Sequence, residues 1–322
     1  MTQAHSGAAV DKVPRVRPVG PAVRTPSPRR YDHTDFTAAA LVAAKAGRSV
    51  SVCLPARDEE ATVGDIVTCI HTELMVATPL VDEIVVVDDH SRDRTAEVAA
   101  TAGARVVRAV EVLPEYGEGH GKGEALWKSV YAATGDVIVW CDADVVGFQS
   151  HFVTGLLGPV LTNDDIGFVK GYYERSSGSG DRGGRVTELV ARPLLSALFP
   201  ALASIVQPLA GECAGRRDVL EQLPFGEGYG VDIGLLIDVA DRFGTGAVAQ
   251  VDLGHRVHRN RPLDELAPQA TAVLQAVLGR AGRALPEVVT LDRPGLPPVD
   301  VDRVERPPLV DVASYRRLIH SA

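Results

Sequence analysis

Two aspartates, Asp142 and Asp144, end a short apolar stretch and have one small residue between them. The stretch, 137–141, is rich in β-branched residues, which predicts a strand buried on both faces of a parallel sheet. Because side chains alternate along a strand, both carboxylates emerge on the same side, roughly 6–7 Å apart. Ligands of open α/β sheets bind at the carboxyl ends of the strands. Paired carboxylates at that edge suit Mg²⁺ or Mn²⁺, and such an ion takes further ligands from a substrate diphosphate. The alternative is an ordinary strand-ending turn, since Asp favours turns.

Two further positions could meet a nucleotide. Asp89 follows a strand predicted over 83–87, where a group that touches a nucleotide base or ribose is expected. Lys122 lies in a glycine-rich loop before a predicted helix, where its charge and free backbone amides could bind a diphosphate; the alternative is a solvated lysine. The loop is no P-loop, because Tyr116 replaces the first glycine and Gly123 replaces the Ser or Thr that holds Mg²⁺.

A glycine-rich loop in the second half is a candidate anion site. Gly184 and Arg185 precede a predicted helix, so backbone amides and a guanidinium converge on a pocket for a phosphate or carboxylate. A flexible surface loop is the alternative. The glycines match a dinucleotide fingerprint, but 189–211 contains no acidic residue where that motif needs one, so a dehydrogenase is not favoured.

A basic segment follows the strand predicted over 247–253. His258 is a candidate metal ligand, against the alternative of a structural histidine. Arg256 and the arginines beside it indicate anion capture, because a local basic cluster is unusual in an acidic chain; a solvated basic face is the alternative.

The elements that position these residues alternate between strands and helices. Strands are predicted over 48–54, 83–87, 104–108 and 137–141, with Pro55 ending the first, and helices begin near Glu59, Asp93 and Glu124. This order predicts an α/β fold with a mostly parallel, Rossmann-like sheet flanked by helices and joined by right-handed crossovers. Further strands are expected over 166–173 and 247–253, and further helices over 186–198, 218–223, 230–243 and 262–281.

The composition limits the function classes. The chain has 322 residues, 45% hydrophobic and 23% charged, which is typical of a globular protein, and its net charge of −9 argues against a nucleic-acid partner. Four scattered cysteines favour reduced structural thiols in the cytoplasm over disulfides or a zinc site. We recognise no signal peptide, and prolines interrupt the uncharged segment 193–211, which predicts a buried helix pair or a dimer surface rather than a membrane span.

Three motifs at successive strand ends resemble the GT-A fold glycosyltransferases: Pro55-x-x-x-Glu59-Glu60, Asp88-Asp89-x-Ser91-x-Asp93-x-Thr95 and Asp142-x-Asp144. The chain is also similar to the glucosyl-3-phosphoglycerate synthases of mycobacteria and their relatives. Four more segments carry this similarity: 121–127, 183–195, 228–238 and 258–266. With this resemblance we expect a flexible tail over 1–44, a GT-A domain over 45–262 and a C-terminal helix with a Pro-rich tail over 263–322. The nucleotide-sugar half would be 45–145 and the acceptor half 146–262.

The resemblance implies a reaction and a set of roles. Glucose would pass from UDP-glucose to the 2-hydroxyl of 3-phosphoglycerate with retention of configuration, in a metal-dependent homodimer, early in methylglucose lipopolysaccharide synthesis. Pro55, Ala56, Arg57 and Glu59 would line the uridine with Asp89 near the base, Lys122 and Arg256 would meet the diphosphate side, and Asp142 would hold ribose or sugar. Asp144 and His258 would hold Mg²⁺ or Mn²⁺, and Gly184, Arg185, Thr187 and Asn260 would grip the acceptor.

Two points are left open by the resemblance. Asp232, expected at the donor, stands where the family pattern has Glu, which weakens a direct contact with the glucose. Glu212 is the candidate nucleophile for a covalent intermediate, and front-face attack without a nucleophile is the alternative. Other possible functions are a transferase with another donor, such as GDP-mannose, a nucleotide-sugar sensor without catalysis, and a nucleotidyltransferase.

Overall fold

The structure, a computed structural model, describes residues 27–175, 184–256 and 262–319. An eight-stranded sheet runs through the molecule in the order β1-β9-β6-β7-β5-β2-β3-β4. Neighbouring strands are parallel except at β7, which is antiparallel to both β5 and β6. The expected mostly parallel α/β sheet is therefore confirmed. Its strands are β1 (Arg29–Asp32), β2 (Val50–Ala56), β3 (Glu83–Asp88), β4 (Arg105–Arg108), β5 (Val137–Trp140), β6 (Phe168–Arg175), β7 (Cys213–Arg216) and β9 (Val248–Arg256).

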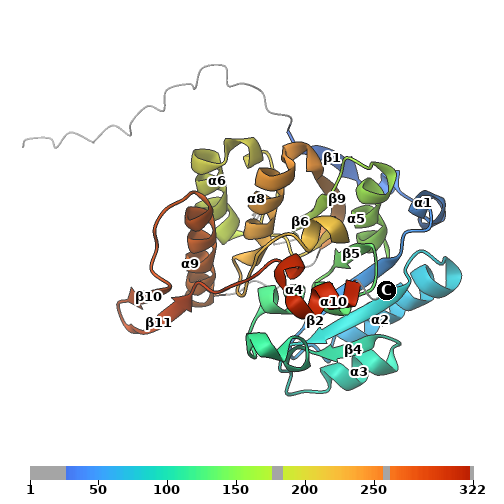
Figure 1. Cartoon of the computed structure of the whole chain (residues 1–322), viewed down its shortest axis with the longest axis horizontal. Coiled ribbons are helices and arrows are strands. Elements are labelled where there is room, and N and C mark those ends of the chain that lie inside the picture. Colours follow the sequence, from blue (N-terminus) through green and yellow to red (C-terminus); the bar gives the residue numbers. More distant parts are fainter. Residues whose placement is uncertain (1–26, 176–183, 257–261, 320–322) are drawn as a thin grey trace, which may run out of the picture.

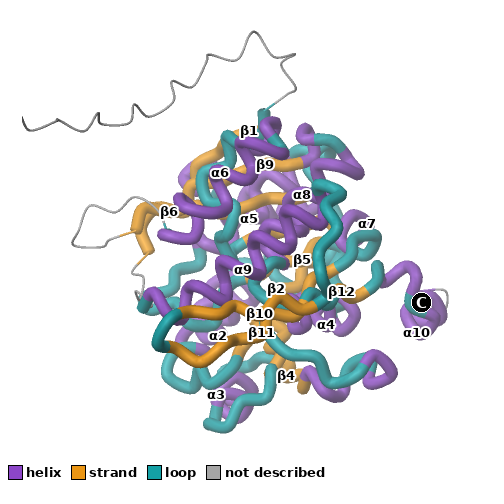
Figure 2. The backbone as a smooth tube through the Cα atoms, turned by 90° about the vertical axis from the view of Figure 1, so that its left-hand side faces the viewer, coloured by secondary structure: helices purple, strands orange, loops and turns teal. Residues whose placement is uncertain are grey.

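Helices cover both faces of the sheet (Figure 1, Figure 2). Along β5, Ile138 and Trp140 join a core with residues of α4 and α8, whereas Val137 and Val139 join a second core with residues of α2 and α5. The predicted burial of this strand on both faces is confirmed. The helices are α1 (Ala38–Lys45), α2 (Val63–Ile70), α3 (Thr95–Thr101), α4 (Lys122–Ala132), α5 (His151–Thr162), α6 (Arg192–Leu198), α7 (Arg217–Leu220), α8 (Val231–Phe243), α9 (Leu263–Arg280) and α10 (Ala313–Ile319).

The chain beyond α9 returns to α4, as Figure 1 shows. A hairpin of β10 (Val288–Arg293) and β11 (Leu296–Asp302) comes first, and β12 (Glu305–Arg306) then pairs with β8 (Phe225–Gly226). In α10, Tyr315 packs against Tyr131 of α4, with ring centroids 6.0 Å apart. α9 confirms the helix predicted over 262–281, and the Pro-rich remainder is folded onto the domain.

Two predictions about the first strands are wrong. The expected flexible tail is ordered from Arg29 onward, because β1 pairs with the edge strand β9 and Leu41 of α1 is buried. Pro55 does not end β2 but lies inside it. Pairing with β5 stops at Cys53, so no hydrogen bond to β5 is lost where proline has no N–H.

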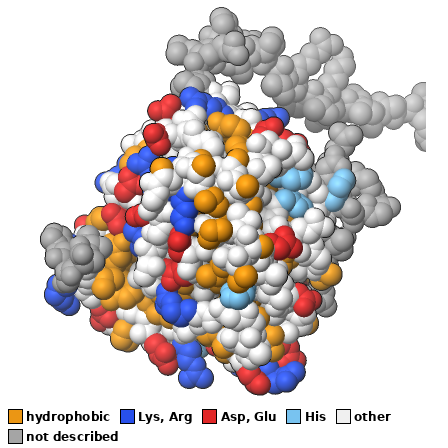
Figure 3. Space-filling view, turned by 90° about the vertical axis from the view of Figure 1, so that its right-hand side faces the viewer, with side chains coloured by type: hydrophobic (Ala, Val, Ile, Leu, Met, Phe, Trp, Pro, Cys, Tyr) orange, Lys and Arg blue, Asp and Glu red, His pale blue; other side chains and the backbone are white. Residues whose placement is uncertain are grey.

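The uncharged segment 193–211 is a broken helix rather than a span. α6 stops at Leu198, and a short 3₁₀ turn, η6 (Pro200–Leu202), follows and buries Leu202. Across the described residues, no helix combines the length and the apolar character needed to cross a membrane. On the face drawn in Figure 3, acidic and basic side chains are interspersed among small apolar areas.

Candidate active site

The loops after β2 and β3 are joined by reciprocal hydrogen bonds at the carboxyl edge of the sheet. The N–H of Asp58 donates to Ser91 Oγ (3.0 Å), and Asp58 Oδ1 accepts from the N–H of Arg92 (2.7 Å). The N–H of Glu59 donates to Thr95 Oγ1 (2.7 Å). Asp58 has a φ of +56°, in the left-handed region that Asp tolerates better than most residues. The first two sequence motifs therefore form one wall of the site.

Asp89 connects this wall to the glycine-rich loop before α4. Its side chain is buried, and its backbone N–H donates to the carbonyl of Ala56 (2.9 Å). Its Oδ2 accepts a hydrogen bond from the N–H of Gly121 (2.9 Å), the residue before α4 begins. The position of Lys122, the first residue of α4, is thus coupled to the end of β3.

Arg256, the last residue of β9, converges on the two aspartates that follow β5. Its Nη1 lies 3.3 Å from Asp142 Oδ2, and its Nη2 lies 2.9 Å from Asp144 Oδ1. The same Nη1 donates to Glu212 Oε1 and to the hydroxyl of Tyr173 (3.1 Å). Glu212 is fully buried, whereas the side chain of Asp144 is 46% exposed. Asp144 is accordingly the most exposed carboxylate among those that Arg256 contacts.

Lys122 lies on the other side of Asp142. Its Nζ is 2.9 Å from Asp142 Oδ1 and 3.3 Å from Asp232 Oδ2. Asp232, in the first turn of α8, also pairs with Lys170 of β6 at 3.4 Å, and the Lys170 ammonium donates to the carbonyl of Ala210 (2.6 Å). A continuous chain of charged contacts therefore runs from β6 through α8 and α4 to the end of β5.

Burial and neighbouring charges shift the pKa values of this cluster in different directions. Burial disfavours ionisation of Asp142, but Lys122 and Arg256 outweigh it and hold the pKa of Asp142 below its usual value. For Glu212, burial outweighs the attraction of Arg256, so the pKa is raised. Burial also disfavours charge on Lys122 and Arg256, yet the surrounding carboxylates raise the pKa of both. Both cations therefore stay charged beside an ionised Asp142.

The residues present fit a divalent cation. Four carboxylates and three cationic side chains lie in contact, which leaves one formal negative charge. Exposed carboxylate oxygens such as those of Asp144 suit Mg²⁺ or Mn²⁺. Two predicted residues, the metal ligand His258 and the acceptor residue Asn260, lie outside the described residues, shortly after β9 ends.

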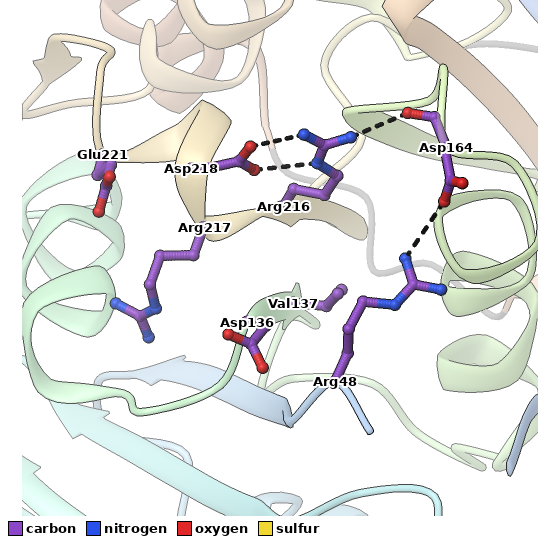
Figure 4. A pocket seen from close by; sticks show the side chains of 8 residues that line it. All are labelled: Arg48, Asp136, Val137, Asp164, Arg216, Arg217, Asp218 and Glu221. Atoms are coloured by element: carbon purple, nitrogen blue, oxygen red, sulfur yellow. Dashed lines mark hydrogen bonds and ion pairs between the residues drawn. The ribbon is translucent and has the colours of Figure 1, made fainter. Parts of the chain in front are cut away.

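A cavity of about 430 Å³ lies at the opposite edge of the sheet, beside Val137, where β5 begins (Figure 4). Two of its arginines face acidic partners: Arg216 contacts Asp218 at 2.5 Å and Arg48 contacts Asp164 at 3.9 Å. Ligands of such sheets bind at the carboxyl ends of the strands. Both the location and the paired charges therefore argue against this cavity as the active site.

Comparison with known proteins identifies the family. Residues 51–223 match the model of glycosyl transferase family 2. The chain is 42% identical to the glucosyl-3-phosphoglycerate synthase of Petrotoga mobilis, over 89% of this chain and 95% of that protein. The chain belongs to the glucosyl-3-phosphoglycerate synthase family. The resemblance found in the sequence is thereby confirmed, as is the assignment to the glycosyltransferases.

Two crystal structures extend the comparison. The Mycobacterium tuberculosis glucosyl-3-phosphoglycerate synthase in complex with Mn²⁺, UDP-glucose and phosphoglyceric acid is 45% identical, with a TM-score of 0.81 over 89% of this chain and 99% of that one. The mannosyl-3-phosphoglycerate synthase of Rubrobacter xylanophilus is 41% identical, with a TM-score of 0.80 over 88% of this chain and 97% of that one. The GT-A fold expected for this family is confirmed by the first of these structures.

Most residues predicted for the donor meet at one edge of the sheet. Asp142, Asp144, Arg256, Lys122 and Glu212 form a single cluster of contacts, and Asp232 joins it through Lys122. Pro55 and Ala56 are the last residues of β2, and Arg57 and Glu59 follow in the wall that ends at Asp89. Their individual roles stay predictions for the glucosyl-3-phosphoglycerate synthase reaction.

Three of the four predicted acceptor residues precede or begin a π-helical turn, η5 (Thr187–Ala191), that leads into α6. Gly184 and Arg185 come just before it, with Arg185 exposed, and Thr187 is buried. This segment packs against α9. A grip on the acceptor by these residues likewise stays a prediction.

Three residues of the cluster were not predicted. Lys170 is buried in β6. The sequence feature that could have pointed to it is a single lysine inside the apolar stretch predicted as that strand. Tyr173 stacks under Arg256, whose Cζ lies 5.2 Å from the ring centroid. Gly211 lies so close to Asp142 and Lys122 that a Cβ there would force their side chains to shift. No local pattern reveals such a long-range approach.

Proposed function

We propose that the protein is a metal-dependent glucosyl-3-phosphoglycerate synthase. It transfers glucose from UDP-glucose to the 2-hydroxyl of 3-phosphoglycerate with retention of configuration, early in methylglucose lipopolysaccharide synthesis. The observation that carries the proposal is the contact of Asp142, Asp144, Lys122 and Arg256 at one sheet edge. The 45% identity to an enzyme crystallised with Mn²⁺, UDP-glucose and phosphoglyceric acid supports it.

The charges suit the departure of a nucleoside diphosphate. Negative charge grows on the diphosphate as its bond to the sugar breaks, and fixed cations stabilise that charge. Lys122 is partly buried, Arg256 is buried, and both are charged and held in place by carboxylates, so they need little rearrangement. A divalent cation held by Asp144 and His258 would supply further neutralisation of the diphosphate. Arg256 contacts one oxygen of Asp144, which leaves the other oxygen as a possible metal ligand while Arg256 stays in place.

The two substrates occupy opposite sides of this cluster in the proposal. Pro55, Ala56, Arg57 and Glu59 line the uridine, Asp89 faces the base, and Asp142 holds the ribose or sugar. Asp232 lies on the donor side, where it pairs with Lys122. Gly184, Arg185, Thr187 and Asn260 bind the acidic acceptor. The reciprocal hydrogen bonds between the β2 and β3 loops support the first assignment, because they make a firm wall beside Asp142.

For the retaining step we favour front-face attack over a covalent intermediate. Glu212 is fully buried and pairs with Arg256, which suits a counter-ion that holds this arginine in place. In front-face transfer the acceptor oxygen bonds to the anomeric carbon on the face from which the diphosphate departs. The hydroxyl proton passes to the departing diphosphate oxygen, so no enzyme nucleophile is needed.

The experiment is a donor–acceptor activity matrix with and without added Mg²⁺ or Mn²⁺. We expect UDP release only with UDP-glucose, 3-phosphoglycerate and a divalent cation together. The second candidate is a mannosyl-3-phosphoglycerate synthase, which the 41% identity to the Rubrobacter xylanophilus enzyme supports. GDP release with GDP-mannose in place of UDP release would establish it, and pyrophosphate release would indicate a nucleotidyltransferase.

We also propose a homodimer that works in the cytoplasm. The neighbouring segments η5 and α9 expose large apolar side chains, with Leu189 74% and Leu263 66% exposed, and such an area suits a subunit contact. All four cysteines are free thiols, which fits a reducing compartment. Light scattering of the purified chain tests the dimer, and a monomer across the micromolar range would contradict it.

A further inference from the structure

A second group of potential metal ligands lies where the loop after β3 meets the glycine-rich loop before α4. It consists of Asp89, His90 and His120. One ligand atom from each residue lies within 4.8 Å of the other two. The first two residues follow β3 and the third lies thirty positions later, so the fold rather than the local sequence brings them together.

The three side chains are already held in place. His90 Nδ1 lies 2.8 Å from Asp89 Oδ1, and the tilted rings of His90 and His120 have centroids 4.4 Å apart. The other carboxylate oxygen of Asp89 accepts the N–H of Gly121 (2.9 Å), next to His120 in the chain. His90 has a φ of +64°, an uncommon conformation that costs energy for a residue other than glycine and fixes the direction of its side chain.

One polar atom of this group is unexplained by the protein alone. His90 Nε2 is buried and makes no hydrogen bond, although a buried imidazole nitrogen normally has a partner. Asp89 Oδ1 and His90 Nδ1 lie 2.8 Å apart, close enough for both atoms to bind the same ion. His120 is exposed, so an ion can reach the group from solvent.

From these observations we propose that Asp89, His90 and His120 form a binding site for a borderline divalent transition-metal ion of the Zn²⁺ class. Two imidazoles and one carboxylate are ligands that Zn²⁺ takes at about 2.0–2.2 Å, with a fourth position left for water. Mg²⁺ prefers oxygen ligands and suits the carboxylates of the Asp142–Asp144 edge instead. The two sites share no ligand and differ in the ions that they prefer.

The ion would join two loops that the nucleotide site needs. Asp89 ends the wall formed by the β2 and β3 loops, and His120 precedes Lys122 by two residues. An ion between them therefore fixes the glycine-rich loop relative to the end of β3. We expect binding to raise the melting temperature of the protein, whether or not the chain has glycosyltransferase activity.

The test is calorimetric titration of the metal-free full chain with Zn²⁺, in excess Mg²⁺ and without nucleotide, in an Asp144→Asn background. This background removes the most exposed carboxylate of the first site, and the excess Mg²⁺ competes for the oxygen ligands that remain there. We expect one Zn²⁺ per chain. His120→Ala and His90→Asn should each weaken binding at least about tenfold. Asparagine is chosen at 90 because it tolerates left-handed backbone. Co²⁺ in place of Zn²⁺ should give a visible spectrum that both variants lose.

The matched control is His71→Ala, which removes a half-buried histidine outside this group and should leave Zn²⁺ binding unchanged. His120 is exposed, so its removal should not prevent folding, and the circular dichroism spectrum checks this. Zn²⁺ binding that is absent from the Asp144→Asn protein, or equal in the parent and the His120→Ala variant, would overturn the proposal. Either result would leave the proposed transferase activity untouched.

Discussion

Arg256 is the residue on which the charges of the active site converge. It contacts Asp142, Asp144 and Glu212 at once, and 4% of it is exposed. The guanidinium contacts Oδ1 of Asp144, so a metal ion bound at the other oxygen would lie close to it. We therefore expect Arg256 and the metal ion to neutralise the diphosphate together.

The first prediction is that Asp144→Asn nearly abolishes metal-dependent turnover. The amide cannot replace the exposed carboxylate as an anionic ligand, and we expect kcat to fall on the order of 10³-fold, as for lost transition-state stabilisation. UDP release measured across a Mn²⁺ titration checks this. Asp218→Asn is the control, because Asp218 is an exposed, arginine-paired aspartate at the other edge of the sheet. Equal metal activation of the Asp144→Asn enzyme would contradict the assignment.

The second prediction concerns Asp142 and pH. Lys122 and Arg256 hold its pKa below the usual value against the effect of burial, so its ionised form stabilises the folded state. That stabilisation is present above the unfolded pKa of about 3.9 and is lost as pH falls through the lower folded value. The stability advantage of the parent over Asp142→Asn, from urea unfolding, should therefore be constant at pH 5–7 and shrink below about pH 4. If the stability difference between the parent and Asp142→Asn increased at acidic pH, the Asp142 carboxylate would not be held in its ionised form.

At the residue scale, chemistry that is local in the chain could be predicted. Asp142 and Asp144 follow a strand and Lys122 begins a helix, so the neighbouring sequence marks each of them as a candidate site residue. Lys170 and Gly211 matter only because β6 and the segment before β7 pass close to α4 and α8. Such proximity depends on strand order, which the sequence alone does not define.

Among the elements, α4 is the one whose position decides the site, and the C-terminal segment holds it. Arg306 of β12 pairs with the buried Glu124 (2.6 Å) and with Glu227 (2.7 Å), and its Nη1 donates to the carbonyl of Tyr116 (2.7 Å). Trp127 of α4 donates its Nε1–H to the carbonyl of Pro307 (2.9 Å). The helix that begins at Lys122 is thus fixed by residues far along the chain.

The third prediction follows from this clamp. Arg306→Gln should lower the free energy of unfolding by about 3 kcal/mol, because the fully buried Glu124 loses one of its two ion-pair partners among the described residues and keeps Lys128. It should also raise the KM for UDP-glucose more than it lowers kcat, because α4 and Lys122 are less firmly placed. Urea unfolding and steady-state kinetics measure the two effects. Arg306→Lys should lower the free energy of unfolding by a smaller amount, because lysine keeps the positive charge beside Glu124.

The matched control for the clamp is Arg303→Gln, three residues earlier in the same segment. Arg303 is exposed, so the substitution should change stability by less than about 0.5 kcal/mol. If Arg306→Gln destabilised the protein without changing the KM for UDP-glucose, the segment would support the fold but not the donor site. Equal effects at both positions would contradict the clamp itself.

Helices and strands with a clear periodic pattern of apolar residues were predicted, and elements without such a pattern were missed. The strands β3 and β5 and the helices α8 and α9 lie within a few residues of their expected bounds. α5 was missed because it is buried over most of its length and has no polar face to mark a helical period. β1 and β7 have four residues each, too few for a pattern, and are strands only because neighbouring strands pair with them.

At the scale of the whole molecule, the central sheet separates two apolar cores. Cys53 and Cys213 belong to one core and Cys141 to the other, while Cys69 in α2 is partly exposed. Four scattered cysteines predicted structural thiols, and their burial agrees with that interpretation. Which core holds each thiol depends on strand order and could not be predicted.

The last prediction tests whether these cores stay closed. Burial raises the pKa of Cys53 and of Cys213 to about 12, and burial together with Glu73 raises the pKa of Cys69 to about 11. Since the thiolate is the reactive form, about one Cys69 in a thousand is reactive at pH 8. The native protein should therefore react slowly with a disulfide reagent at pH 8, at a rate that rises about tenfold per pH unit toward pH 10. Denatured protein should react at four thiols.

The Cys69→Ser variant separates the partly exposed thiol from the buried ones. It should remove nearly all the native reactivity and leave three thiols to react after denaturation, because the remaining cysteines lie in the closed cores. Rapid reaction of the native variant at pH 8 would mean that the central strands open on the time scale of labelling. Since Cys141 directly follows β5 and precedes Asp142, such opening would also disturb the carboxylates of the active site. Slow labelling would instead support a rigid sheet edge, which fixed charges at a departing diphosphate require.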